Sequence, residues 1–174
     1  RLVARLEERM EDREAARSVA VGAARYYMLK FGNTQPITFD FDEALRTTGE
    51  TGVYLQYAHV RASGILRRCA TAGIVARPAP PPEDLPRPDR DLALALASHP
   101  RALAAAAADL SAQAVAKHAF ELATAFSTFY DNTTPVVQEA DDALRAWRAG
   151  LVAASRAVLA DTLGILGIPA LERI

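Results

Sequence analysis

The sequence predicts an all-α protein built as a helical bundle. Long stretches of good helix formers lie between proline and glycine breaks, and apolar residues recur at steps of three and four. Strand-like alternation is confined to one short stretch. With 174 residues, 51% of them hydrophobic and 24% charged, the chain can bury one good core. We therefore expect helices that pack as antiparallel or right-angled neighbours.

The first expected helix covers residues 1–30, and Gly32-Asn33 gives it a stop. Arginine recurs in it at every fourth position among glutamates, which is typical of a solvated face held by ion pairs at three- and four-residue spacing. A row of arginines facing phosphates is the alternative, and the neighbouring glutamates weaken it. The arginines concerned are Arg1, Arg5, Arg9, Arg13 and Arg17.

The next elements are short and are separated by clear breaks. Residues 33–41 alternate as a brief extended piece, after which Asp40 or Asp42 can cap a short helix through Arg46. Thr51 is a suitable N-cap for a longer helix over residues 53–72. Six prolines crowd residues 74–90, which predicts a non-helical surface connection without chemistry.

The second half is expected to return to helix at 90–98, 100–107 and 109–131. Within it, Phe126 and Phe129 are expected to pack inward and Tyr130 to reach the surface. Asn132-Thr-Thr-Pro135 then breaks the chain. A last helix over 140–166 ends at Gly167, and Pro169 prevents its resumption.

One helical face stands out because it combines phenols with a guanidinium. Tyr54, Tyr57 and Arg61 follow each other at steps of three and four, which places them together on a helix. Aromatic planes beside a fixed cation suit unstacked bases and the phosphates that join them. Ordinary packing of the two tyrosines is an equal alternative on this evidence, and Tyr130 is open in the same way.

The charge, the apolar runs and the cysteine count restrict the class of protein to which the chain can belong. Twenty Lys and Arg against twenty-one Asp and Glu give a net charge of −1, so no strongly basic surface announces a nucleic-acid binder. No apolar run approaches the ~20 residues that cross a membrane. The single cysteine, Cys69, rules out an internal disulfide and fits a reducing cytoplasm. Arg1 stands where an initiator Met is expected, which favours a piece of a longer chain.

Known catalytic and metal-binding patterns are not found. The three histidines (His59, His99 and His118) are isolated in the sequence, and one cysteine cannot supply a zinc site. There is no glycine-rich phosphate loop and no Gly-x-Ser-x-Gly turn. Asp141-Asp142 is interpreted as a helix start rather than a catalytic pair. We therefore expect no catalytic residue and no metal site.

Four ordered blocks resemble the C-terminal part of the arginyl-tRNA synthetases. The fourth begins with the letters Asp-Ala-Leu-Arg, after which the helical anticodon-binding domain of that family is named. The resemblance covers about 20–73 and 91–174. The blocks are residues 21–30, then 39–45 with 49–61, then 129–131, then 142–148 with the tail 166–174.

The resemblance implies a division and a function. Residues 1–49 would be the helical C-terminal end of a catalytic body, and 50–174 the anticodon-binding bundle with its proline-rich loop at 74–90. The family joins L-arginine to its tRNA with ATP and Mg²⁺ in a class I site. Its His-x-Gly-His-like and Lys-Met-Ser-Lys-Ser-like motifs are missing here and would lie upstream. This piece alone would therefore bind no cofactor and catalyse nothing.

The resemblance also implies which residues meet the anticodon of tRNA(Arg): Tyr54, Tyr57, Arg61, Tyr130 and Ile174. Ile174 departs from the Met that often ends the family. The expected setting is a cytoplasmic, monomeric parent enzyme that binds neither DNA nor membrane. The alternative is a free-standing helical module that binds tRNA or a protein without ligase activity.

Overall fold

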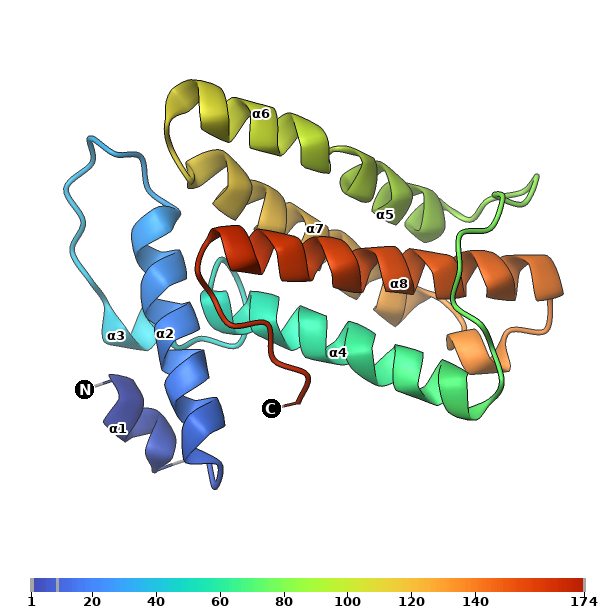
Figure 1. Ribbon diagram of the computed structural model, residues 1–174, viewed down its shortest axis with the longest axis horizontal. Coiled ribbons are helices and arrows are strands. Elements are labelled where there is room, and N and C mark those ends of the chain that lie inside the picture. The colour runs from blue at the N-terminus through green and yellow to red at the C-terminus, as the bar shows by residue number, and fades with distance from the viewer. Residues whose placement is uncertain (1, 9, 174) are drawn as a thin grey trace.

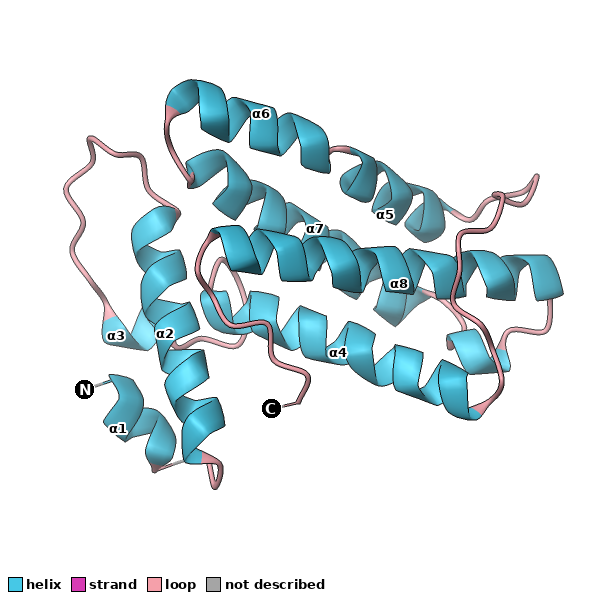
Figure 2. Cartoon of the chain, viewed as in Figure 1, coloured by secondary structure: helices cyan, strands magenta, loops and turns pink. Residues whose placement is uncertain are grey.

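The computed structural model describes residues 2–8 and 10–173, whose regular elements are all helices, without a strand (Figures 1 and 2). The expected all-α fold is confirmed. No helix in these ranges is both long and apolar enough to cross a membrane. The helices are α1 (Leu2–Glu7), α2 (Arg13–Leu29), α3 (Phe41–Ala44), α4 (Gly52–Thr71), α5 (Arg87–Ala97), α6 (His99–Asp109), α7 (Gln113–Asn132), the 3-10 turn η1 (Val136–Gln138) and α8 (Asp142–Ile165).

The main bundle consists of α4, α5, α7 and α8, with α6 continuing the direction of α5 along α7 (Figure 1). Helices α4 and α8 pack along each other, as do α5 and α7. Their facing stripes form one core, which Tyr26 of α2 also joins. Its largest fully buried side chains from the bundle include Phe126, Phe129, Leu55, Leu122 and Leu159. Burying this apolar surface is the main force that holds α4 against α7, and α4 and α7 carry the candidate site.

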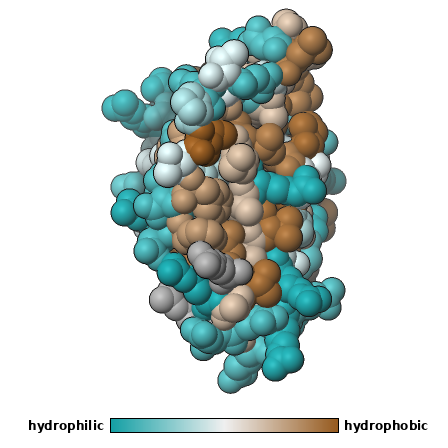
Figure 3. Space-filling view, turned by 90° about the vertical axis from the view of Figure 1, so that its left-hand side faces the viewer, coloured by the Kyte–Doolittle hydropathy of each residue, from teal (hydrophilic) through white to brown (hydrophobic). Residues whose placement is uncertain are grey.

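Helix α2 crosses the start of α4 at close range through two glycines. A Cβ added to Gly52 would lie 2.0 Å from the carbonyl oxygen of Gly22, so neither backbone leaves space for a side chain there. Beyond the crossing, α1, α2 and α3 share a smaller apolar cluster that includes Val19, Tyr27 and Ala44. The face at this end of the molecule carries a band of apolar surface between hydrophilic margins (Figure 3).

The expected single helix over residues 1–30 is wrong, because the chain forms two helices with a break before Arg13. The Asp12 carboxylate accepts hydrogen bonds from the backbone N–H groups of Glu14 and Ala15, which caps a new helix instead of continuing the first. The break also interrupts the arginine row. Arg5 pairs with Asp42 at 2.5 Å, whereas Arg1 and Arg9 lie outside the described residues.

The proline-rich stretch differs from the prediction in two ways. Helix α5 already begins at Arg87, with Pro88 in its first turn, where a missing N–H costs no hydrogen bond. The stretch also carries a structural ion pair, since Asp89 is fully buried and receives two hydrogen bonds from Arg148 of α8, at 2.9 and 3.2 Å. Arg148 also donates to Glu139 at 2.6 Å. The end of this loop is therefore tied into the bundle.

The predicted helix ends are mostly confirmed. Asp40 caps α3 and Thr51 caps α4, where its hydroxyl accepts from the N–H of Tyr54. Gly167 has φ +65° and the N–H of Ile168 donates to the carbonyl of Leu163, a Schellman ending for α8. Helix α7 starts later than expected, after a turn in which Leu110 takes φ +48°.

Two of the histidines are neighbours rather than isolated groups, which corrects the sequence-based interpretation. The rings of His99 and His118 lie 5.2 Å apart, and His99 donates to the Asp161 carboxylate at 2.8 Å. The Ser98 hydroxyl donates to the carbonyl of Ala95, so His118 donates to Ser98 through Nδ1. Its buried Nε2 finds no partner among the described residues. Protonating it would bury an unpaired N–H.

This arrangement predicts a loss of stability in mild acid. Burial lowers the pKa of His118 below its ordinary 6.5, and His99 and Arg101 act in the same direction while Glu121 opposes them. The unfolded chain therefore binds more protons, and the free energy of unfolding falls as pH drops below 6.5 towards the folded-state pKa. Urea unfolding at about pH 7.5 and about pH 5.5 measures it. His118→Leu should flatten the difference, and an unchanged difference in that variant would assign it to other groups.

Candidate nucleic-acid interface

An arginine between two exposed tyrosines forms the centre of the candidate site. Helix α4 supplies Tyr57 and Arg61 one turn apart, and the end of α7 supplies Tyr130. The guanidinium carbon of Arg61 lies over both rings, 5.0 Å from the centroid of Tyr57 and 4.6 Å from that of Tyr130. Tyr57 is 48% exposed and Tyr130 is 39% exposed. Two aromatic planes and a cation are thus held together at the surface.

Tyr54 lies one turn earlier on α4 and is half-buried. Its hydroxyl donates to the Ser127 hydroxyl at 2.9 Å, and its ring packs against Phe120 at 5.9 Å. Both partners belong to α7, so Tyr54 fixes the distance between the two helices that carry the site. The sequence pattern grouped Tyr54 with Tyr57, but in the structure Tyr54 packs between α4 and α7 and is less exposed than Tyr57.

A shallow hollow of about 480 Å³ lies beside these side chains. Tyr54, Tyr57 and Arg61 form one wall, Ser127 and Asp131 another, and Thr47 and Thr48 from the loop before α4 close an edge. Four of the five predicted site residues are therefore brought together: three line the hollow, and Tyr130 contacts it through Arg61. Ile174 lies outside the described residues.

The described end of the chain is bound to a different face of α4. The buried amide of Gln56 donates to the carbonyl of Pro169 at 2.9 Å, and Nδ1 of His59 donates to the carbonyl of Leu171 at 2.8 Å. The returning tail lies alongside α4 (Figure 1). Gln56 and His59 thus anchor the tail, a role that sequence reasoning missed. Their three-residue spacing was the available signal, because it places two polar groups on one helical face.

An ion pair fixes the tail further. Arg156 of α8 donates to the Glu172 carboxylate at 2.5 Å, and this hydrogen bond is the main reason that the pKa of Glu172 is lowered. Arg156 also donates to Ser63 of α4 at 3.0 Å. The tail, α4 and α8 are therefore joined at one place.

The site offers stacking and hydrogen bonding rather than covalent chemistry. Its groups are phenols, a guanidinium, hydroxyls and one exposed carboxylate. Within the described ranges, no three His, Cys, Asp or Glu side chains gather closely enough to hold a metal ion. A partner with flat rings and negative charge, such as single-stranded RNA, matches these groups.

Known proteins that are similar to this chain include arginine–tRNA ligases and a solved arginyl-tRNA synthetase. Arginine–tRNA ligase of Pyrococcus furiosus is 34% identical over 94% of this chain, and that of Thermus thermophilus is 38% identical over 91%. The solved Thermus thermophilus arginyl-tRNA synthetase has a TM-score of 0.86 and 35% identity, and the match covers 99% of this chain and 30% of that one. The chain spans 27% of the length of these two curated relatives.

The family model of the DALR anticodon binding domain matches residues 55–174. The match includes Arg61 and Tyr130 at the centre of the site, the Asp142-Ala-Leu-Arg145 start of α8 and the bound tail. The chain belongs to the DALR anticodon-binding domain family.

Proposed function

We propose that this chain is the anticodon-recognising part of an arginine–tRNA ligase and that its site binds the anticodon loop of tRNA(Arg). The observation that carries the proposal is the cation of Arg61 held between the exposed rings of Tyr57 and Tyr130. Membership of the anticodon-binding family and relatives named arginine–tRNA ligase support it. A free-standing module without ligase activity gains no support from these relatives.

The proposal extends to the parent enzyme. ATP, Mg²⁺ and L-arginine would bind in the rest of the parent, since the present chain spans 27% of the length of its curated relatives. Residues 1–49 would form the helical end of the catalytic body. Most of the smaller apolar cluster, including Val19, Tyr27 and Ala44, comes from this segment, which supports the division. We propose a cytoplasmic, monomeric parent whose partner is tRNA rather than DNA or a membrane.

Removing either exposed ring tests the proposal. A base stacked on an aromatic side chain contributes about 1–3 kcal/mol, so Tyr57→Ala and Tyr130→Ala should each weaken binding of the tRNA(Arg) anticodon stem-loop about tenfold or more. Fluorescence anisotropy with a labelled stem-loop RNA measures the Kd.

Tyr57→Phe and Tyr130→Phe serve as controls because they keep the ring and remove the hydroxyl. They should retain most of the affinity. If both alanine variants bind the stem-loop as tightly as the unsubstituted chain does, the site assignment is wrong.

A further inference from the structure

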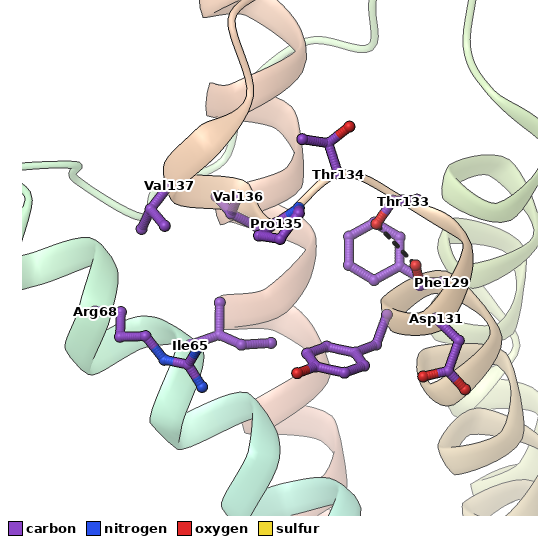
Figure 4. Close-up of a pocket in the computed structure, with 10 residues that line it drawn as sticks. Ile65, Arg68, Phe129, Asp131, Thr133, Thr134, Pro135, Val136 and Val137 are labelled. Carbon is purple, nitrogen blue, oxygen red and sulfur yellow. Dashed lines mark hydrogen bonds between the residues drawn. The ribbon is translucent and has the colours of Figure 1, made fainter.

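A second hollow has Tyr130 among its lining residues but not Tyr54, Tyr57 or Arg61. It has a volume of about 300 Å³ and lies between α4, the end of α7 and the turn η1 (Figure 4). Its deepest lining residues are apolar and buried: Ile65 is 8% exposed, Phe129 1% and Val136 5%. A pocket of this size lies at the lower end of the range that holds small ligands.

Polar side chains also line the hollow, among them the positively charged guanidinium of Arg68. Arg68 approaches from α4 beside Ile65, and Asp131 approaches from α7 (Figure 4). Arg68 is exposed, and among the described residues no carboxylate pairs with it. Asp131 and the hydroxyls of Thr133 and Thr134 provide acceptors. Apolar walls with a guanidinium and a carboxylate at the edge suit a flat heterocycle that carries amino groups and hangs from a phosphate.

The two hollows are adjacent, because they share a lining residue. Asp131 lines both of them. Tyr130 faces the guanidinium of Arg61 and also lines the second hollow. On α4, Arg68 follows Arg61 by two turns, so it extends the same helical face by about 10 Å. A single strand lying across Tyr57 and Arg61 therefore reaches this second hollow.

We propose that the second hollow holds one further base of the same single-stranded RNA, with Arg68 contacting its phosphate or base edge. The inference rests on the proposed function, because it needs the strand to lie on the Tyr57–Arg61–Tyr130 surface. It adds a second, more enclosed binding position and assigns it Ile65, Arg68 and the turn after α7. The pocket would discriminate between bases by their shape and by whether they carry an amino group that can donate a hydrogen bond to Asp131.

Blocking the pocket tests the inference. Val137 is 37% exposed at its edge, and Val137→Trp would fill it with the variant's own indole ring. This variant and Arg68→Ala should each weaken binding of the tRNA(Arg) anticodon stem-loop about five- to tenfold. Two control variants make the same changes elsewhere: Leu94→Trp on α5 adds an indole ring, and Arg101→Ala on α6 removes a guanidinium. Both should bind the stem-loop as tightly as the unsubstituted chain does.

Abasic nucleotides identify the bound base and separate the two proposals. Stem-loops that each lack one loop base are measured in turn, and one of them should already bind the unsubstituted chain weakly. Val137→Trp should not weaken the binding of that stem-loop further, whereas Tyr57→Ala should. If Tyr57→Ala lowers the affinity of the intact stem-loop while Val137→Trp and Arg68→Ala do not, the second pocket holds no base and the proposed function stands. If no variant changes binding, both proposals fail.

Discussion

Replacing Arg148 by alanine is expected to lower the free energy of unfolding by about 3–5 kcal/mol, because it leaves a buried carboxylate without its counter-ion. Asp89 is fully buried and both of its oxygens accept hydrogen bonds from the Arg148 guanidinium. Glu139 would lose its 2.6 Å partner as well. The loss should exceed that of any surface ion pair in the chain, since an exposed pair contributes about 0–1 kcal/mol.

Urea unfolding followed by far-UV circular dichroism measures this loss. Arg87→Ala is the matched control, because Arg87 makes an exposed pair with Asp91 on the same helix α5. Combining Arg148→Ala with Asp89→Asn should recover part of the stability, since the neutral amide carries no buried charge. A loss below about 1 kcal/mol in Arg148→Ala would show that water satisfies Asp89 in solution.

Replacing Gly52 by alanine is expected to cost about 1–3 kcal/mol or more, since the added methyl group meets backbone rather than a movable side chain. Its Cβ would lie 2.0 Å from the carbonyl oxygen of Gly22 and 3.0 Å from the backbone nitrogen of Ala23. Relief requires α2 to move away from α4, which opens the contact around the buried Gln56. Thermal and urea unfolding of the variant measure the cost.

Gly164→Ala is the control for helix propensity. A Cβ there meets no atom within 4 Å, so the variant should gain about 0.5–1 kcal/mol from the reduced freedom of the unfolded chain. Opposite signs for the two substitutions would establish that the helix crossing, rather than the loss of glycine, decides the effect at Gly52. A stabilised Gly52→Ala would contradict the close crossing.

Much of the fold could be predicted from local chemistry. Asp40, Thr51 and Gly167 act within a few residues of their own positions, so their roles as caps and stops are visible in the sequence. The surface position of Tyr130 was also predicted locally, from the polar Asp131-Asn132 and the break that follow it, and the residue is 39% exposed. Local rules worked at these positions because the deciding contacts lie within a few residues.

The features that could not be predicted depend on residues distant in sequence or on close competition. Asp89 and Arg148 meet across 59 positions, and nothing near Asp89 marks it as buried. His99 and His118 come together because α5, α6 and α7 pack side by side. The break before Arg13 was missed because the Asp12 cap competes with a helix that the composition also favours.

The candidate site shows the same limit. Steps of three and four placed Tyr57 and Arg61 together on one helix, and only the family resemblance grouped them with Tyr130, 69 residues later. Neither revealed that Arg61 lies over the Tyr130 ring. Nor did the sequence reveal that Gln56 and His59 hold the tail, because their partners are backbone carbonyls. Their three-residue spacing marked one polar face of α4, but a contact to backbone leaves no residue-type signature of the partner segment.

Arg61 also bears on the entropy of recognition. A free arginine side chain carries about 2 kcal/mol of rotamer entropy, which a binding surface normally loses when its ligand arrives. Here two tyrosine rings already restrict the guanidinium in the unbound chain, so much of that ordering precedes association. A lysine at this position would keep the charge but not the planar group that both rings hold. The arginine is therefore preorganised as well as charged, and Arg61→Lys is not a conservative change.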